Sequence, residues 1–336
     1  MRLLWLSAAL TPLVWTGSGP ATWLIESPRE GARIHSSFVA LYGTAPPGAC
    51  AGVFSAGARI ARVCSGRTGD PRVFHHILRL PAGECSLELR PETQEGRPAA
   101  ISIVVDPPDA HPQSEAHWER MLPGDVVLSH SVRSEQSALY NAVFTHAAID
   151  AGVSPDGAPL IAEAVTTEDA EGLGEVRTVP IEQSMAFRRG ENVAICRPVE
   201  PLAPAERRAL FDFLESVVNR GLKYWNAAED FRYLYAAWML WDSHGDRPGD
   251  APRFDRLLAD MQTRKLSTDR FTCATLVWRA YWTATRGRLD LSSPNCEHMG
   301  GRLAGALSPA FLRRIGPYYV SADSLYCSGR LQEAGE

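Results

Sequence analysis

The alternation of apolar and polar positions divides the chain near residue 106. Between residues 23 and 106, short runs of β-branched and aromatic residues, such as 38–42 and 100–105, are separated by turn signals rich in Pro, Gly and Asp. Closely spaced strands of this kind are typical of a β-sandwich. We therefore expect an all-β N-terminal domain over residues 23–106, and residues 80–89 resemble a hairpin of bacterial immunoglobulin-like modules.

The pattern after residue 123 mixes strand and helix periods. Apolar runs at 124–128, 144–149, 160–165 and 192–196 predict strands, and residues 131–142 predict a helix. Residues 204–221 show helical apolar spacing between a proline at the start and a glycine at the end. Residues 224–241 and a segment that begins near Cys273 predict two further helices, with an insertion at 242–268. The mixture predicts an α+β domain over residues 123–336.

Two segments fall outside these domains. Residues 107–122 begin with several prolines and predict a Pro-rich linker. Residues 1–18 combine Arg2 with an apolar stretch over 3–15 and small residues after it, the pattern of a secretory signal peptide. A buried N-terminal strand is the alternative interpretation. With the signal peptide, the protein is expected to be exported (periplasmic, cell-surface or secreted) and to keep no integral membrane segment after cleavage.

Composition adds limits on function. The 336 residues are 45% hydrophobic and 22% charged, as in ordinary globular proteins, and the length suits two domains. The net charge is −5 and no basic stripe is visible, so we expect no nucleic-acid partner. The seven cysteines leave at least one thiol unpaired, although export permits disulfides. One pair among Cys50, Cys64 and Cys85 could be bridged, and Cys296 could pair with Cys327.

Candidate metal ligands are sparse in the sequence. Cys296 and His298 supply two ligands, which do not make a metal site, and no cysteine pair has the CxxC spacing of a zinc ribbon. His75 and His76 are adjacent on a predicted strand, so their side chains point to opposite faces. We expect a surface or turn role for them rather than metal binding.

Cys273 is the candidate nucleophile. The helical spacing of Leu276, Val277, Ala280 and Tyr281 puts it at a helix N-terminus, with Thr272 as a plausible N-cap. The helix dipole there lowers the pKa of a thiol, and the free backbone N–H groups can bind an oxyanion. A small buried residue in a core helix, or half of a disulfide, would explain the same position.

A reactive cysteine needs a base and a group that orients the base. His146 is the best candidate base, because it lies in the apolar strand 143–149, although a satisfied core histidine is the usual explanation for such a residue. Glu163 lies in the middle of the apolar run 160–165, where a carboxylate requires a partner. That partner could be His146, or Glu163 could belong to a structural ion pair.

The order of these motifs carries a resemblance. The chain is similar to circularly permuted NlpC-like papain-fold hydrolases of the YiiX/YaeF type in four motifs and in their order. These are Gly124–Val127, Phe144–Ile149 with its His, Ile161–Val165 with its Glu, and Thr272–Val277 with its Cys. In this permuted group His precedes Cys, as here. Further similarity runs through residues 176–182, 192–198 and 307–312. The family commonly has Ser and then an acidic residue after Cys, whereas this chain has Ala274 and Thr275.

The resemblance implies a permuted papain-like, NlpC-like domain with Cys273 as nucleophile, His146 as base and Glu163 as orienting residue. The implied activity is hydrolysis of an amide or ester bond through an acyl-enzyme, with no cofactor required. Relatives act on cell-wall peptides or on lipid acyl groups, so both substrate classes stay open, as does acyl transfer. One alternative is a non-catalytic cell-surface ligand-binding module with a vestigial cleft. Another is a disulfide-stabilised surface module in which Cys273 is bridged.

Overall fold

The computed structural model describes residues 22–93, 97–109, 116–130, 143–165, 174–224, 227–242, 247–292 and 308–335. The predicted signal peptide and the helix predicted at 131–142 lie outside these residues. No helix in the described ranges is both long enough and apolar enough to cross a membrane.

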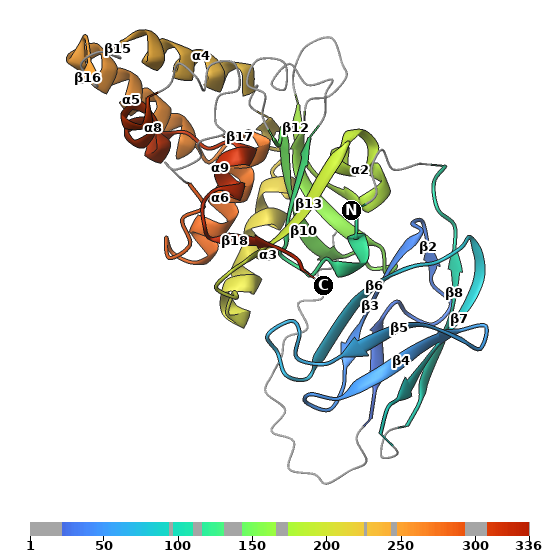
Figure 1. Cartoon of the computed structure of the whole chain (residues 1–336). Coiled ribbons are helices and arrows are strands. Elements are labelled where there is room, and N and C mark those ends of the chain that lie inside the picture. The colour runs from blue at the N-terminus through green and yellow to red at the C-terminus, as the bar shows by residue number, and fades with distance from the viewer. Residues whose placement is uncertain are drawn as a thin grey trace.

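The N-terminal region is β-rich and forms a two-layer sandwich (Figure 1). One sheet has the order β1-β3-β6 and the other β2-β8-β7-β4-β5. Apolar side chains from both sheets, including Leu41, Phe74, Val53 and Leu87, meet in one core. The strands are β1 (Leu24–Ser27), β2 (Arg33–Ile34), β3 (Phe38–Thr44), β4 (Cys50–Ser55), β5 (Ala58–Cys64), β6 (Val73–Arg79), β7 (Gly83–Pro91) and β8 (Ala99–Val105). An immunoglobulin-like topology stays a prediction.

The cysteines of the sandwich are now assigned. Cys50 and Cys64 are directly opposite on the paired strands β4 and β5 and form a disulfide, while Cys85 is a buried free thiol. Cys327 is also disulfide-bonded, and Cys296, its predicted partner, lies outside the described residues. Cys273 is free, which removes the interpretation that it is half of a disulfide.

The second region is built on an eight-stranded sheet of order β17-β14-β12-β11-β10-β9-β13-β18. All neighbouring pairs in it are antiparallel except β14 and β17. Its central strands are fully buried, which explains their continuous apolar runs. The strands are β9 (Val126–His130), β10 (His146–Val153), β11 (Pro159–Val165), β12 (Glu175–Pro180), β13 (Asn192–Pro198), β14 (Lys223–Tyr224), β17 (Arg270–Phe271) and β18 (Leu331–Glu333).

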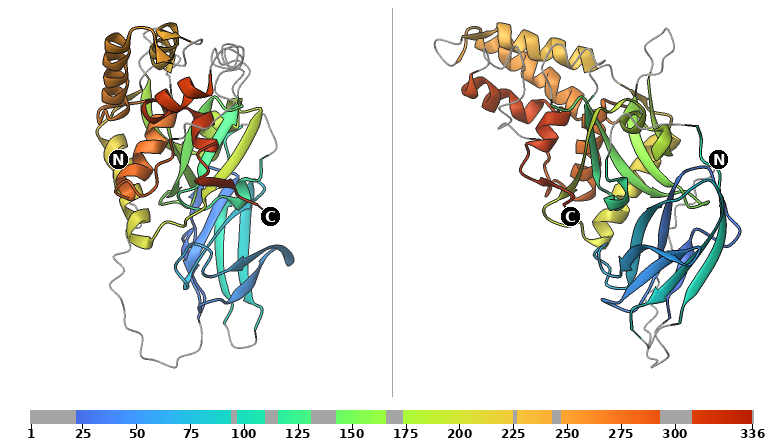
Figure 2. Two further views of the ribbon diagram at one scale, coloured as in Figure 1. Left: turned by 60° about the vertical axis from the view of Figure 1, so that its left-hand side comes forward. Right: turned by 45° about the vertical axis from the view of Figure 1, so that its right-hand side comes forward.

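Helices cover this sheet and extend from it. Apolar residues of α3 and α6 pack against β9, β10 and β11 in the largest core of the molecule. Helices α4, α5 and α8 form a separate core, which lies at the end of the molecule away from the sandwich (Figures 1 and 2). The helices are α2 (Met185–Arg189), α3 (Pro204–Asn219), α4 (Ala227–Met239), α5 (Ala251–Lys265), α6 (Cys273–Ala284), α8 (Pro309–Ile315) and α9 (Ala322–Tyr326). Short 3₁₀ turns are η1 (Trp118–Arg120), η2 (Ile181–Gln183) and η3 (Gly316–Tyr318).

The helix predicted at 224–241 is shorter than expected. It begins at Ala227 and ends at Met239, and Trp241 lies instead in β15 (Trp241–Asp242), which pairs with β16 (Arg247–Pro248). Trp241 packs against Phe254 and Phe311, so its contacts are to α5 and α8. The apolar spacing continues past the end of the helix because Trp241 packs in the same local core from a β-strand.

The sandwich and the second region are packed against each other along β3. Phe38 and Ala40 point toward the second region, while Val39 and Leu41 point into the sandwich core. Phe38 packs edge-to-face on Phe187 of α2, with ring centroids 6.0 Å apart. Strand β3 is thus buried on both faces, which accounts for its unbroken apolar run.

A buried carboxylate fixes this contact. Glu182 of η2 is 1% exposed and accepts hydrogen bonds from the hydroxyls of Ser36 and Ser37 and from the Ser37 backbone N–H at 2.6 Å. Trp118 and Met121, from the end of the predicted linker, are buried near the same place. Part of the predicted linker therefore contributes to the core between the two regions.

Candidate active site

The structure brings His146, Glu163 and Cys273 together. His146 begins β10 and Cys273 begins α6, which packs across β10 and β11. Glu163 on β11 is directly opposite Ala148 on β10, so it is the diagonal neighbour of His146 on the same face of the sheet. The His146 ring nitrogen Nε2 lies 3.1 Å from Glu163 Oε2. This leaves Nδ1 for the thiol of Cys273, which is hydrogen-bonded to the His146 side chain.

The first turn of α6 fixes the position of Cys273. The Thr272 hydroxyl caps the helix by accepting from the Thr275 N–H at 3.1 Å, and the Thr272 N–H donates to the Thr275 hydroxyl at 2.8 Å. This reciprocal pair of hydrogen bonds satisfies two backbone N–H groups at the helix start. Thr275, where the resembled family has an acidic residue, therefore has a capping role here.

The thiol of Cys273 is activated by its surroundings. It is 7% exposed, and burial alone would raise its pKa. The hydrogen bond and positive charge of His146, together with the backbone N–H groups of Ala147 and Ala274, outweigh burial and lower the pKa below its usual value. The site favours a thiolate paired with an imidazolium.

His146 shows the complementary shift. Burial of the imidazole would lower its pKa, but the hydrogen bonds and negative charges of Cys273 and Glu163 outweigh burial and raise it to about 10. A charged His146 is therefore favoured at neutral pH. The imidazole of His146 can therefore hold the proton that leaves Cys273.

Glu163 is held by more partners than His146 alone. It is 0% exposed, and its Oε1 accepts from Arg177 Nε at 3.0 Å and Nη2 at 2.8 Å. Its Oε2 accepts from the Met185 backbone N–H at 2.9 Å as well as contacting His146. Burial would raise the pKa of Glu163, but His146, Arg177 and this N–H outweigh it and lower the pKa. The carboxylate stays ionised and fixed in orientation.

Arg177 and Met185 were not among the sequence candidates. Arg177 is directly opposite Glu163 in the β11–β12 pairing. A charged residue on the strand after a buried carboxylate is the one signal that could have identified it. The contribution of Met185 is a backbone N–H, which no side-chain pattern reports.

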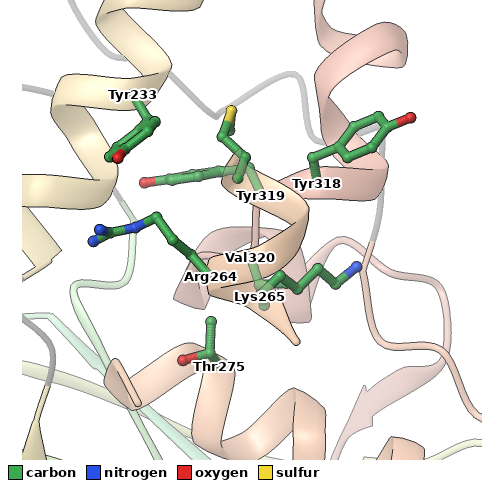
Figure 3. Close-up of a pocket in the computed structure, with 8 residues that line it drawn as sticks. Tyr233, Arg264, Lys265, Thr275, Tyr318, Tyr319 and Val320 are labelled. Carbon is green, nitrogen blue, oxygen red and sulfur yellow. The ribbon is translucent and has the colours of Figure 1, made fainter. Parts of the chain in front are cut away.

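A small cavity lies beside the first turn of α6 (Figure 3). Its volume is about 20 Å³, and Thr275 lies at its floor, one helical half-turn from Cys273. Figure 3 shows Tyr233, Arg264 and Tyr319 pointing toward one another above Thr275. Lys265 is 6% exposed and stacks over Trp278, and burial lowers its pKa to about 8. The wall of this cavity is thus aromatic and cationic, and Cys273 does not line it.

Metal ligands do not gather in the described part of the chain. Within it, no three His, Cys, Asp or Glu side chains are placed to hold a metal ion. The candidate pair Cys296 and His298 lies outside the described residues.

Comparisons with known proteins give two structural likenesses. No family model and no curated protein matches the sequence. The metalloprotein yiiX from Escherichia coli O157:H7 is matched with a TM-score of 0.37 and 15% identity, over 65% of this chain and 98% of that one. CopC from Methylosinus trichosporium OB3b is matched with a TM-score of 0.21 and 15% identity, over 26% of this chain and 94% of that one. The chain is similar to yiiX in its mixed α+β region and to CopC in its β-rich region.

Proposed function

We propose that this protein is an exported cysteine hydrolase with a permuted papain-like, NlpC-like domain, which cleaves an amide or ester bond. The observation that carries the proposal is the hydrogen-bonded series from Cys273 to His146 to Glu163, with Cys273 at the N-terminus of α6. The predicted signal peptide supports export, and the Cys50–Cys64 disulfide agrees with an oxidising compartment. The substrate is a cell-wall peptide or a lipid acyl group.

The first half-reaction follows from the ion pair. The Cys273 thiolate attacks the substrate carbonyl carbon, and the carbonyl π electrons move to oxygen to give a tetrahedral oxyanion. The Cys273 backbone N–H lies in the first turn of α6, where the helix itself supplies no acceptor, so we assign it to this oxyanion. The intermediate collapses as the His146 imidazolium gives its proton to the leaving amine or alcohol. A thioester on Cys273 remains.

The second half-reaction uses the same groups. Neutral His146 now takes a proton from water, whose oxygen attacks the thioester carbonyl, and the Cys273 thiolate leaves as the acid product forms. Glu163 accepts from Nε2 throughout, so the other nitrogen stays directed at the sulfur and the incoming water. Arg177 and the Met185 N–H keep Glu163 in place while the charge of His146 changes.

Labelling the purified full chain with a carbonyl-directed activity probe tests this function. We expect the label on Cys273, since burial raises the pKa of Cys85 and raises that of Cys196 to about 12. Cys196→Ala should label like the wild type, and Cys273→Ala should not label. Label on another cysteine of the folded chain, or a Cys273 that reacts only after unfolding, would reject the nucleophile. An inert Cys273 would favour the ligand-binding module.

A further inference from the structure

A second cavity lies between the sandwich and the α+β region, far from Cys273 along the fold. Its volume is about 220 Å³, whereas one water needs only ~10–15 Å³. Gly124 and Asp125, which precede β9, line it, and Tyr281 near the end of α6 donates a hydrogen bond to the Gly124 carbonyl. The catalytic residues are at the opposite ends of α6 and β10. This cavity is therefore a separate site.

The arginines that line the cavity differ in whether a carboxylate pairs with them. Asp125 is bound bidentately by Arg197, with nitrogen–oxygen distances of 2.9 and 2.7 Å. Arg207 of α3 is half-buried, donates to the Thr68 backbone carbonyl and makes no ion pair with any carboxylate in the described ranges. Arg67, on the exposed rim, likewise has no carboxylate partner there. Asp125 and Asp70 act on Arg207 only from beyond ion-pair distance, so its half-buried guanidinium has no carboxylate of the described residues in direct contact, whereas the charge of Arg67 lies at the exposed rim.

The cavity also contains a buried hydroxyl group that lacks a hydrogen-bond partner among the described residues. Thr68 lines the cavity and is 6% exposed, and its Oγ1 is buried without a hydrogen-bond partner among the residues that the structure describes. Such groups in a folded protein are nearly always paired. Thr68 lies between Gly66 and Gly69, which both have positive φ, and a side chain at position 69 would come within 3.5 Å of Arg207 Nη2. The turn leaves open space beside the guanidinium.

The remaining wall of the cavity is apolar. It consists of Leu122, Pro123, Pro198, Pro201 and Leu202. Arg67, Thr68 and Arg207 supply donors, and guanidinium groups bind phosphate and carboxylate oxygens through paired hydrogen bonds. We propose that this cavity binds a small organic anion, with its phosphate or carboxylate group against Arg67, Thr68 and Arg207 and its carbon part against Leu122 and Leu202.

Calorimetric titration of the full chain tests the site, at constant ionic strength set with chloride. The probes are phenyl phosphate, benzoate, inorganic phosphate and acetate. At least one phenyl compound should bind. Because of the apolar wall, phenyl phosphate should then bind more tightly than inorganic phosphate, or benzoate more tightly than acetate. Which of phenyl phosphate and benzoate binds better identifies the anionic group. Absence of binding by all four probes overturns the proposal.

Variants locate the binding. Arg67→Gln and Thr68→Val should each weaken it about tenfold, the loss of one charge-assisted hydrogen bond. Thr68→Val should leave the melting temperature unchanged or higher, because the hydroxyl has no partner to lose. Arg72→Gln is the matched control, since Arg72 is exposed near the same turn but outside the cavity. Equal affinity in Arg67→Gln, Thr68→Val and the wild type would overturn the site.

A last variant separates this site from the catalytic one. The helix start at Cys273 could also attract anions, so Cys273→Ala is titrated with the same probes. Unchanged affinity is expected, because Cys273 does not line the cavity. Lost affinity would place the anion at the thiol and overturn the proposal. An inert Cys273 in the labelling experiment would leave this result unaffected, so the two proposals fail independently.

Discussion

Two buried histidines, one in the sandwich and one in the α+β region, have opposite acid–base properties. His75 of β6 is 3% exposed, and burial first, then the positive charges of His76, Arg207 and Arg197, lowers its pKa to about 3. Its Nδ1 has no hydrogen-bond partner in the described part of the chain. His146 is 8% exposed, and its partners Cys273 and Glu163 raise its pKa to about 10 despite burial.

The difference shows that the partners of a buried histidine, rather than its burial, decide which of its protonation forms is stable. His75 is surrounded by apolar side chains and cations, so only its neutral form is stable. His146 lies between two anions, so its charged form is stable and its proton can be used. Each of the following predictions removes one part of this contrast.

The largest effect is expected from Cys273→Ala. Loss of a covalent nucleophile should lower hydrolysis of acyl-amide and ester surrogates by several orders of magnitude. Unfolding free energy should change by about 1 kcal/mol or less, because Ala is a good helix former and little volume is lost. Denaturant titration and initial rates measure the two. Cys196→Ala, in the core between β9 and β18, should lose stability and keep its rate; the inverse pattern would make Cys273 structural.

Glu163→Gln should have the next largest effect. The amide keeps the shape of the side chain but removes the negative charge, so the pKa of His146 should fall and its orientation weaken. We expect the rate to drop by about 10²-fold, within the range of general acid–base catalysis. The pH dependence of Cys273 alkylation should shift as well, because the thiolate loses part of its imidazolium partner.

Glu182→Gln is the control for this change. Glu182 is equally buried and lies nearby in the chain, but its hydrogen bonds go to Ser36 and Ser37 rather than to a histidine. It should lose stability and keep the wild-type alkylation profile. If both variants changed that profile alike, the effect would come from the packing of the two regions and not from His146.

The stability profile in acid should depend on His75. Its pKa is ~6.5 in an unfolded chain and about 3 when folded, so the unfolded state binds more protons between these values. Stability that is present above pH ~6.5 is then lost toward pH 3, at up to about 1.4 kcal/mol per pH unit. His75→Leu should flatten the urea-unfolding profile between neutral pH and pH 5, since Leu has no proton to gain. The exposed His35→Gln should not, and equal slopes in all three proteins would contradict the assignment.

His146 should act in the opposite direction at alkaline pH. Its folded pKa of about 10 lies above the unfolded value of ~6.5, so its contribution is complete below ~6.5 and is lost as pH rises through 10. The lowered pKa of Cys273 in the same ion pair contributes in the opposite sense, and Lys265 also titrates there, so the alkaline limb of the stability curve reports the ion pair and its neighbours rather than His146 alone.

His75 also shows where sequence reasoning failed. The expectation of a surface or turn role was wrong because His75 shares its face of β6 with Ile77, and that face is covered by the α+β region. The alternation of the strand was visible in the sequence, but the docking of one region on the other was not. The same holds for Ser36 and Ser37, whose partner Glu182 is 145 or more positions away.

Other features were predictable because they are local. The start of α6 at Cys273 and the cap at Thr272 were predicted from apolar spacing and are confirmed. The proximity of His146 and Glu163 could be expected from two consecutive antiparallel strands. Arg177 could not be assigned, because its position opposite Glu163 depends on the register of β11 and β12. The catalytic roles of the three side chains stay predictions.

The smallest effect is expected from Arg177→Gln. Arg177 contacts Glu163 Oε1, whereas His146 and the Met185 N–H contact Oε2. The variant therefore leaves His146 with its acceptor, and the rate near neutral pH should fall by about tenfold at most, an order less than general-base catalysis supplies. The pKa of Glu163 should rise, since one of the charges that lower it is removed. The loss of rate should then grow as pH falls, because Glu163 takes up a proton earlier than in the wild type.

Two further arginine variants decide whether this effect is electrostatic. Arg177→Lys keeps the charge but not the paired hydrogen bonds. It should therefore restore the wild-type shape of the rate profile at acid pH more fully than it restores the rate at neutral pH. Arg188→Gln is the matched control, because Arg188 bonds the Glu182 carbonyl and does not touch Glu163. An Arg177→Gln loss as large as that of Glu163→Gln, and independent of pH, would mean that Oε1 fixes the whole carboxylate and that His146 depends on position more than on charge.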